Sequence, residues 1–206
     1  MTPDELERAL ARAAPDSDPD AAAAAARRAA ERAGAGGEAD VAYAIEPSPL
    51  GDLLVAMTPR GLVSVYYEDA GERDDLLDRL AGRLSPRVVE APARIDPVRR
   101  ELDEYFAGTR TEFEVPLDWS LTDGFTRRVL KATARIPYGG ASTYREMAGR
   151  AGSERAARAA GNALGANPIP IIVPCHRVLR SGGALGGYGG GVARKRFLLD
   201  LEGTLT

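Results

Sequence analysis

Two side chains that could carry nucleophilic chemistry stand next to each other near the end of the 206-residue chain. Cys175 is the only cysteine and His176 is the only histidine. A thiol attacks as its thiolate, and an imidazole is the side chain best suited to accept a proton near neutral pH. A lone buried cysteine can also be inert packing, so the residue types alone leave both interpretations open. One cysteine and one histidine exclude an internal disulfide and a zinc site built from these two residue types.

A proline-rich stretch must position the thiol. Prolines at 168, 170 and 174 interrupt an apolar run that ends at Val173. Proline fixes φ, removes a backbone donor and keeps the preceding residue out of the helical region. We therefore expect an upstream helix to end before this stretch. Cys175 should then lie at the edge of a rigid hydrophobic surface.

The charge of the chain is divided unevenly along its length. Residues 1–118 carry 14 Lys and Arg against 25 Asp and Glu, a net charge of −11. Residues 119–206 carry 13 against 5, a net charge of +8. This asymmetry favours contact between the C-terminal part and a polyanion such as nucleic acid. The alternative is two ordinary solvated surfaces of unlike charge.

Composition sets further limits on the class of protein. No apolar run approaches the roughly 20 residues that cross a bilayer, and no secretory signal pattern is present. The single cysteine fits a reducing compartment, so we expect a cytoplasmic protein with no membrane partner. We expect no metal and no cofactor, because no cluster of carboxylates or other ligands suggests one.

The surroundings of Cys175 resemble the O6-alkylguanine-DNA alkyltransferases, also called methylated-DNA–protein-cysteine methyltransferases. The similar string is Asn-Pro-x5-Pro-Cys-His-Arg-Val, residues 167–178. Other segments on both sides of this string also match, in the same order as in the family. They are Thr143-Tyr144, Arg155-Ala-Ala-Arg158, the glycine-rich run 186–191 and the run 198–203 that contains Glu202. The resemblance is strong over 121–203 and weaker over 41–118.

The resemblance implies an alkyl transfer in which the protein is consumed. Cys175 is the acceptor, and a relay of a water molecule, His176 and Glu202 removes its proton. Attack on an alkyl carbon leaves a thioether, which water does not readily hydrolyse. The implied enzyme is a single-turnover methylated-DNA–protein-cysteine S-methyltransferase acting in direct-reversal DNA repair.

The same resemblance implies a set of pocket residues. Tyr188 walls the alkyl pocket, Pro170 lines it, and the Gly189 N–H faces guanine O6. Tyr144 donates to the guanine ring, and the carbonyls of Cys175 and Val178 accept from its exocyclic amine. Asn167 is implied to be structural.

Residues 143–165 predict two short helices joined by a glycine-containing turn, a helix-turn-helix pattern. The second helix, expected over 153–165, is rich in alanine and presents Arg155, Arg158 and Asn162 at i, i+3 and i+7. In the family this module binds the minor groove of double-stranded DNA. There the residue matching Arg158 replaces a flipped nucleotide, and the residue matching Tyr144 helps to rotate it. Taken alone, the segment could equally be a packed Ala/Arg helix.

Three regions are expected along the chain. Residues 1–40 are an Ala-rich appendage, partly helical or mobile. Residues 41–118 form a supporting α/β domain similar to the family's ribonuclease-H-like domain. Its strands are expected at 41–45, 52–57, 62–67 and 87–90, and its helices at 72–84 and 97–107. Residues 119–206 form a mainly helical, winged-helix-like domain, with further helices at 123–135, capped by Ser120 or Thr122, and at 192–201.

Several alternatives belong to other functional classes. One is a protein that binds alkylguanine in DNA without removing the alkyl group, although such relatives lack the reactive cysteine. A second is a helix-turn-helix regulator in which Cys175 is only core. A third is a biosynthetic or self-resistance alkyltransferase for bulky adducts. We expect a monomer, and the sequence leaves alkyl size, activity on O4-alkylthymine and cooperativity on DNA open.

Overall fold

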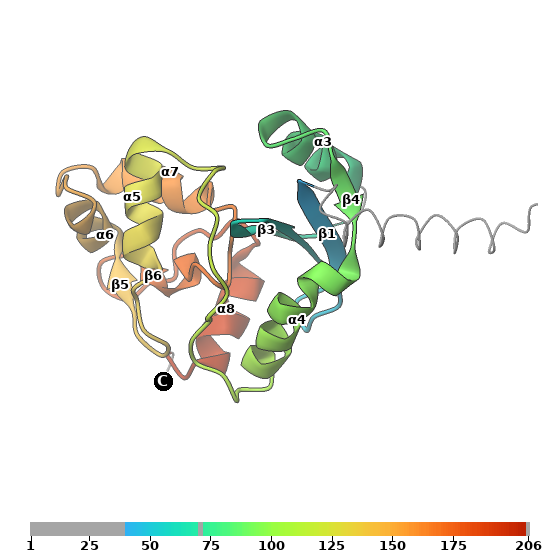
Figure 1. The fold of residues 1–206 in the computed structure, drawn as a ribbon. Helices are drawn as coiled ribbons and strands as arrows, with labels where there is room; N and C mark the ends of the chain where they lie inside the picture. Colours follow the sequence, from blue (N-terminus) through green and yellow to red (C-terminus); the bar gives the residue numbers. More distant parts are fainter. Residues whose placement is uncertain (1–39, 70–71, 205–206) are drawn as a thin grey trace, which may run out of the picture.

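The computed structural model describes residues 40–69 and 72–204, which form two packed parts (Figure 1). The first part is a four-stranded sheet with two helices, and the second is a group of short helices with a two-stranded pairing. The appendage predicted for residues 1–40 lies, apart from Asp40, outside the described residues.

The sheet is built from three consecutive strands and one added later. Strands β1 (Val41–Glu46), β2 (Leu53–Thr58) and β3 (Gly61–Tyr67) form an antiparallel meander. Strand β4 (Val88–Glu90) joins in parallel to β1, so the order is β3-β2-β1-β4. All four predicted strands are confirmed to within one residue at each end.

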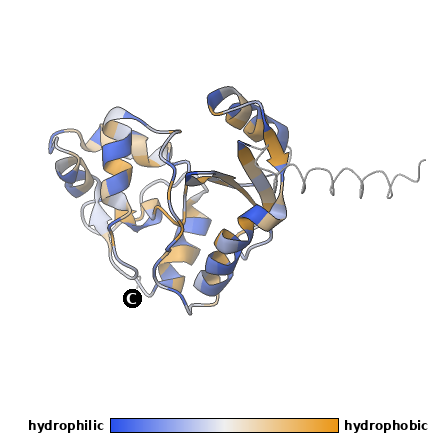
Figure 2. Cartoon of the chain, in the orientation of Figure 1, coloured by the Kyte–Doolittle hydropathy of each residue, from blue (hydrophilic) through white to orange (hydrophobic). Residues whose placement is uncertain are grey.

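Helices α3 (Arg73–Arg83) and α4 (Pro92–Phe106) cover opposite faces of this sheet. Because strand side chains alternate between faces, neighbouring residues serve different helices. The core on the α3 side buries Val41, Leu54, Ala56 and Val63. The core on the α4 side buries Leu53, Val55, Leu62 and Val65. In Figure 2, β1 is mainly hydrophobic, whereas α4 carries both hydrophobic and hydrophilic residues.

Helix α4 begins five residues earlier than predicted. Pro92 occupies its start, where a missing N–H costs nothing, and Pro97 lies inside the helix instead of at its first turn. An interior proline forfeits a backbone hydrogen bond. The burial of Ile95 and Val98 on either side of Pro97 supplies packing that holds the early turns in place.

The second part contains helices α5 (Gly124–Thr133), α6 (Tyr144–Arg150), α7 (Ala157–Gly165) and α8 (Val192–Leu201). The last of these is confirmed at both predicted ends. Strands β5 (Ser142–Thr143) and β6 (Val178–Leu179) pair in parallel. Helices α5, α6 and α7 pack on one another.

The predicted cap of α5 is wrong. Neither Ser120 nor Thr122 caps α5, because Ser120 Oγ donates to Asp118 and Thr122 Oγ1 donates to the Trp119 carbonyl. Asp123 occupies the cap position without a side-chain bond.

Helix α7 begins at Ala157 and not at residue 153. Residues 151–156 form turns in which Gly152 has a φ of +89° and Ser153 N donates to the Ala148 carbonyl. Arg155 therefore precedes the helix. The predicted helical face holds for Arg158 and Asn162 but is wrong for Arg155.

The outer edge of β3 joins the two parts. Leu62 N donates to the Pro116 carbonyl at 2.8 Å, and Asp118 N donates back to the Leu62 carbonyl. Farther along the strand, Val65 N donates to the Pro168 carbonyl at 2.8 Å. The strand edge is thereby covered by residues 116–118, which precede α5, and by the start of the proline-rich stretch. No helix in the described ranges is long and apolar enough to cross a membrane.

Candidate active site

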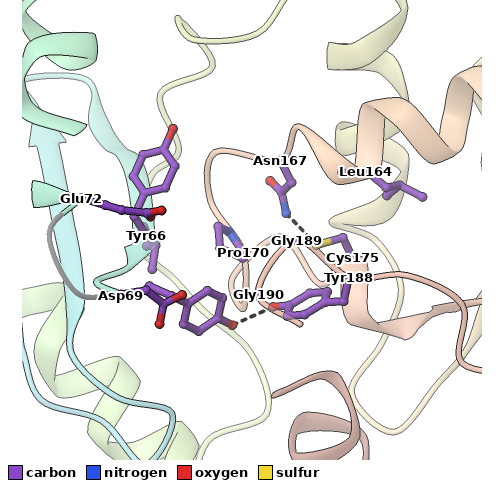
Figure 3. A pocket seen from close by; sticks show the side chains of 13 residues that line it. Tyr66, Asp69, Glu72, Leu164, Asn167, Pro170, Cys175, Tyr188, Gly189 and Gly190 are labelled. Atoms are coloured by element: carbon purple, nitrogen blue, oxygen red, sulfur yellow. Dashed lines mark hydrogen bonds between the residues drawn. The ribbon is translucent and has the colours of Figure 1, made fainter. Parts of the chain in front are cut away.

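The proline-rich stretch ends in a short 3-10 helix, η1 (Cys175–Arg177), which places Cys175 in the interior with 7% of its surface exposed. Asn167, just beyond the end of α7, donates from Nδ2 to Cys175 Sγ at 3.1 Å and to the Val173 carbonyl at 2.8 Å (Figure 3). Its Oδ1 accepts from Ile169 N. Asn167 therefore contacts the thiol itself and also ties the end of α7 to the stretch.

The thiol is protonated in this environment. Burial raises the pKa of Cys175 to about 11, although the Asn167 hydrogen bond and the Lys195 ammonium act in the opposite direction. A pKa of about 11 leaves roughly one thiolate in ten thousand molecules at pH 7. A group that accepts the proton is therefore needed for the sulfur to react.

His176 is placed to be that group. Its Nε2 lies 2.8 Å from Glu202 Oε1, and both side chains are fully buried. Burial lowers the pKa of His176, so the ring is neutral. An ionised Glu202 can only accept, so we assign the proton to Nε2, which leaves Nδ1 with a free lone pair. His176 Nδ1 is buried and has no hydrogen-bond partner among the described residues, so the contact with Cys175 is not direct.

Glu202 accepts hydrogen bonds from three side chains. Besides His176, Arg177 donates from Nε at 2.8 Å and from Nη2 at 2.9 Å, and Tyr105 Oη donates at 2.6 Å. Burial alone would raise the pKa of Glu202, but the bonds from His176 and Arg177 lower it to about 2. The carboxylate is therefore charged at neutral pH and holds the imidazole in one orientation.

Sequence reasoning gave no role to Tyr105, Arg177 or Lys195. Lys195 is fully buried on α8, donates from Nζ to the Val178 carbonyl at 2.7 Å, and has its pKa lowered to about 8 by burial. Lys195 precedes the buried Leu198 by three residues, and this helical spacing could have indicated that Lys195 lies on the buried face of α8. Arg177 lay within the matched string, whereas Tyr105 comes from α4, 97 residues from Glu202.

Two cavities meet at Cys175. The first, of about 180 Å³, lies between β3 and the glycine-rich run, and the second, of about 610 Å³, lies against α7. Tyr188 and Gly189 line both cavities and Pro170 lines the first (Figure 3). Val178 lines neither, since its side chain is buried and its carbonyl already accepts from Lys195.

The second cavity opens onto the exposed surface of α7. Arg158, Asn162 and Tyr144 line it, whereas Arg155 does not. Gly161 lies against the Tyr144 ring, where a Cβ would be in ordinary van der Waals contact, 3.6 Å from Tyr144 Cδ1. Burial raises the pKa of Tyr144, so its hydroxyl remains protonated and can donate. The site thus combines a thiol, a proton acceptor, a hydroxyl donor and an exposed arginine.

Comparison with known proteins supports the two-part organisation. Residues 41–119 match the family model for the ribonuclease-like domain of 6-O-methylguanine DNA methyltransferase, and residues 124–204 match the model for its DNA-binding domain. The predicted fold class, an α/β part followed by a mainly helical part, is thereby confirmed.

Individual relatives cover the chain to different extents. The methylated-DNA–protein-cysteine methyltransferase of Mycobacterium tuberculosis is 57% identical over 102 residues, which span 50% of this chain but 61% of that protein. The protein of the same name from Methanosarcina acetivorans is 40% identical over 162 residues, 79% of this chain and 98% of the relative.

A solved structure gives the same result. The crystal structure of Mycobacterium tuberculosis OGT in complex with DNA has a TM-score of 0.67 at 41% identity, and covers 78% of this chain and 92% of that one. Both the domain models and the relatives therefore agree with the motif around Cys175, and the chain belongs to the O6-alkylguanine-DNA alkyltransferase (methylated-DNA–protein-cysteine methyltransferase) family.

Proposed function

We propose that this protein repairs DNA by direct reversal, transferring the alkyl group of O6-alkylguanine in double-stranded DNA to Cys175 in a single turnover. The observation that carries the proposal is the thiol at the junction of two cavities, beside a neutral His176 that is bonded to Glu202. Family membership and the relatives' printed name support it.

The proton moves first. The lone pair of His176 Nδ1 accepts the thiol proton through a bridging water, since no direct bond joins the two side chains. Glu202 stabilises the resulting imidazolium, as the carboxylate of a protease triad does. Because burial disfavours a standing thiolate, deprotonation and attack are coupled to the arrival of substrate.

The alkyl transfer that follows needs no further reactant. The sulfur forms a bond to the alkyl carbon, the bond from that carbon to guanine O6 breaks, and its electron pair stays on guanine. Tyr144 donates to the guanine ring, the Gly189 N–H faces O6, and the carbonyl of Cys175 accepts from the amine. The Val178 carbonyl is not assigned this role, because it accepts from Lys195. The product is a thioether on Cys175, so the protein is not regenerated.

The base must leave the duplex to reach the sulfur. Extruding a nucleotide costs a few kcal/mol, and less where a lesion weakens pairing. Arg158 is exposed on α7 at the mouth of the second cavity, where its side chain can replace the lost base. Asn162 and Arg155 contact the phosphate backbone of the DNA nearby. The net charge of +8 on residues 119–206 supplies affinity for DNA that falls as the salt concentration rises. The proposed state is a monomer in the reducing cytoplasm, where the thiol persists.

The test separates binding from transfer. A duplex that contains O6-methylguanine is incubated with the wild-type protein and with Cys175→Ser, with an unmodified duplex as control. Intact-mass spectrometry should show one methyl group on the wild type and none on the variant, while fluorescence anisotropy shows similar DNA affinity for both. An unmodified wild-type protein that still binds the lesion would overturn the proposal and favour a non-catalytic binding protein.

A further inference from the structure

Tyr144 and Arg180 leave the two-stranded pairing of the helical part at the same point. Strands β5 and β6 run side by side in parallel, with Thr143 opposite Leu179 in their last pair (Figure 1). The next residue after β5 is Tyr144, which begins α6, and the next residue after β6 is Arg180. Because parallel strands run in the same direction, their register places these two residues next to each other.

The glycine-rich run passes close to both side chains. Arg180 N donates to the Ala184 carbonyl at 2.8 Å, which closes a turn ahead of the run. A Cβ at Gly186 would lie 2.9 Å from Tyr144 Oη and 3.5 Å from Arg180 Nε. The tyrosine hydroxyl and the guanidinium therefore approach the same point of the backbone.

The Arg180 guanidinium is an available positive charge at this site. The side chain is exposed, and among the described residues no hydrogen bond or ion pair engages it. It lines the second cavity beside Tyr144, whereas Arg158 and Asn162 line the same cavity from α7. Burial raises the pKa of the Tyr144 hydroxyl, and the Arg180 charge is the largest influence in the opposite direction. The cation is therefore close enough to polarise the hydroxyl.

The proposed transfer creates negative charge on the base that leaves. The bond from sulfur to the alkyl carbon forms, the bond from that carbon to O6 breaks, and the electron pair spreads over O6 and the ring nitrogens of guanine. The anion then takes up a proton from water, which balances the proton that the thiol has lost. A donor or cation that faces this charge stabilises the transition state more than the ground state, in which the base is neutral.

We propose that Arg180 is a positioning residue for the leaving base, whose charge acts through the Tyr144 hydroxyl to stabilise the guanine anion. The other role open to an exposed arginine is a phosphate contact, which would serve DNA binding and not the transfer step. The location of Arg180 beside the hydroxyl, and not on α7, favours the role in transfer. This inference rests on the proposed function, since it concerns the leaving group of the same reaction.

The experiment measures single-turnover rates on free O6-benzylguanine and on a duplex that contains O6-benzylguanine. Arg180→Gln should slow both reactions about fivefold, because the leaving base is the same in each. Arg180→Lys keeps the positive charge and should stay within about twofold of the wild type. Arg196→Gln is the matched control, because Arg196 is exposed on α8 and lines neither cavity at Cys175. It should leave the free-base rate unchanged.

A change in the leaving group tests the step at which Arg180 acts. Bromine at C8 withdraws electrons from guanine, so the anion released from 8-bromo-O6-benzylguanine needs less stabilisation from the protein. Arg180→Gln should therefore slow the reaction of this compound less than that of O6-benzylguanine. A loss of equal size on the two compounds would show that the substitution changes the shape of the cavity and not its charge, and would overturn the proposal.

A double substitution tests the route through the hydroxyl. In a Tyr144→Phe background, Arg180→Gln should have a much smaller effect on the free-base rate, because the hydroxyl is gone. Equal effects in the two backgrounds would show that Arg180 does not act through Tyr144.

The outcomes separate this inference from the proposed function. If the wild type transfers no alkyl group from either substrate, the proposed function is wrong. If the wild type is active and a folded Arg180→Gln variant keeps the wild-type rate on the free base, the inference is wrong, and a loss confined to the duplex would identify a phosphate contact instead. Arg180→Lys as slow as Arg180→Gln would show that positive charge is not the cause. Circular dichroism and thermal unfolding establish that each variant is folded.

Discussion

The two parts of the molecule contribute to the site in opposite ways. The helical part, basic over residues 119–206, carries the thiol, the imidazole, the carboxylate and helix α7 with the exposed Arg158. The sheet part, acidic over residues 1–118, carries none of these, yet three of its side chains form hydrogen bonds with the site or with the proline-rich stretch. Tyr105 bonds to Glu202, Tyr67 bonds to Tyr188, and Ser64 Oγ donates to the Pro168 carbonyl at 3.2 Å.

This difference shows that the groups proposed to react and the side chains that position them belong to different parts of the molecule. The helical part holds the groups that we propose to react, and the sheet part fixes the side chains on which those groups rest. Substitutions in the helical part should therefore remove activity, whereas those in the sheet part should tune it. The predictions below run from the largest expected effect to the smallest.

The strongest contrast is between Glu202→Gln and Tyr105→Phe. Removing the carboxylate leaves Arg177 buried without a counter-charge, which costs about 3–5 kcal/mol of folding free energy. It also removes the group that orients His176, so single-turnover transfer should fall roughly 10²–10⁴-fold. Tyr105→Phe removes one hydrogen bond to a charged group, worth about 1.5–3 kcal/mol of stability, and leaves the imidazole contact intact.

Urea unfolding and single-turnover rates measure both quantities for both variants. A larger loss of transfer in Tyr105→Phe than in Glu202→Gln would contradict the division of roles. A folded Glu202→Gln variant with wild-type rates would contradict it equally.

Acid should unfold the protein partly through the same buried carboxylate. The pKa of Glu202 is about 2 in the folded protein against an ordinary 4.5, so its ionised form stabilises the fold above pH 4.5. That stability, on the order of 3 kcal/mol, is lost as pH falls from 4.5 towards 2. His176 acts in the same direction, because burial lowers its pKa and the fold resists its protonation below pH 6.5.

Urea denaturation at about pH 5 and about pH 3 measures this loss. Glu202→Gln should show a smaller difference between the two conditions than the wild type. Asp78→Asn changes an exposed carboxylate on α3 of the sheet part and should leave the difference unaltered. An identical acid loss in the wild type and Glu202→Gln would show that Glu202 does not control it.

DNA contact should belong to one part only. Arg158→Ala should slow reaction with an O6-alkylguanine duplex by about tenfold, because the extruded nucleotide is no longer replaced. Reaction with free O6-benzylguanine should change less than about twofold, since no base is flipped. Arg100→Ala, an exposed arginine on α4, is the matched control and should change neither rate. Equal losses on duplex and free base would refute the flipping role of Arg158.

The smallest effect concerns how the helices begin. Helix α6 starts with a capping box, in which Thr143 Oγ1 accepts from Glu146 N and Glu146 accepts from Thr143 N at 3.0 Å. Helices α3 and α4 of the sheet part have no side-chain cap. Thr143→Ala should therefore lower the stability by about 1 kcal/mol, as a shift in the thermal midpoint, whereas Glu72→Ala at the start of α3 should have no comparable effect. Equal shifts would show that the capping box is not stabilising.

Local patterns in the sequence predicted most of the fold. The β-forming residues and the turn residues between them located the strands, and the end of the glycine-rich run located the start of α8. Helix starts were less accessible where the chain lacks a decisive cap. Pro97 gave a misleading start for α4 because packing of Ile95 and Val98 outweighs one lost bond, and the early part of α7 became a turn around Gly152.

The site divides in the same way between local and distant information. The motif placed Cys175 and His176, and the resemblance pointed to Glu202, which the structure brings to 2.8 Å from His176. Tyr67 and Tyr105 could not be found this way. Tyr67 is 121 residues from its partner Tyr188, and Tyr105 is 97 residues from Glu202. Such pairs are set by the packing of the two parts and not by spacing along the chain.

The central claim is that one sulfur accepts one alkyl group and is then spent. The direct measurement is a titration of the protein with excess O6-methylguanine duplex, followed by peptide mapping by mass spectrometry. The account predicts a plateau at one methyl group per protein molecule, located on Cys175, with no further repair. Continued repair beyond that plateau, or a methyl group found on any other residue, would contradict it.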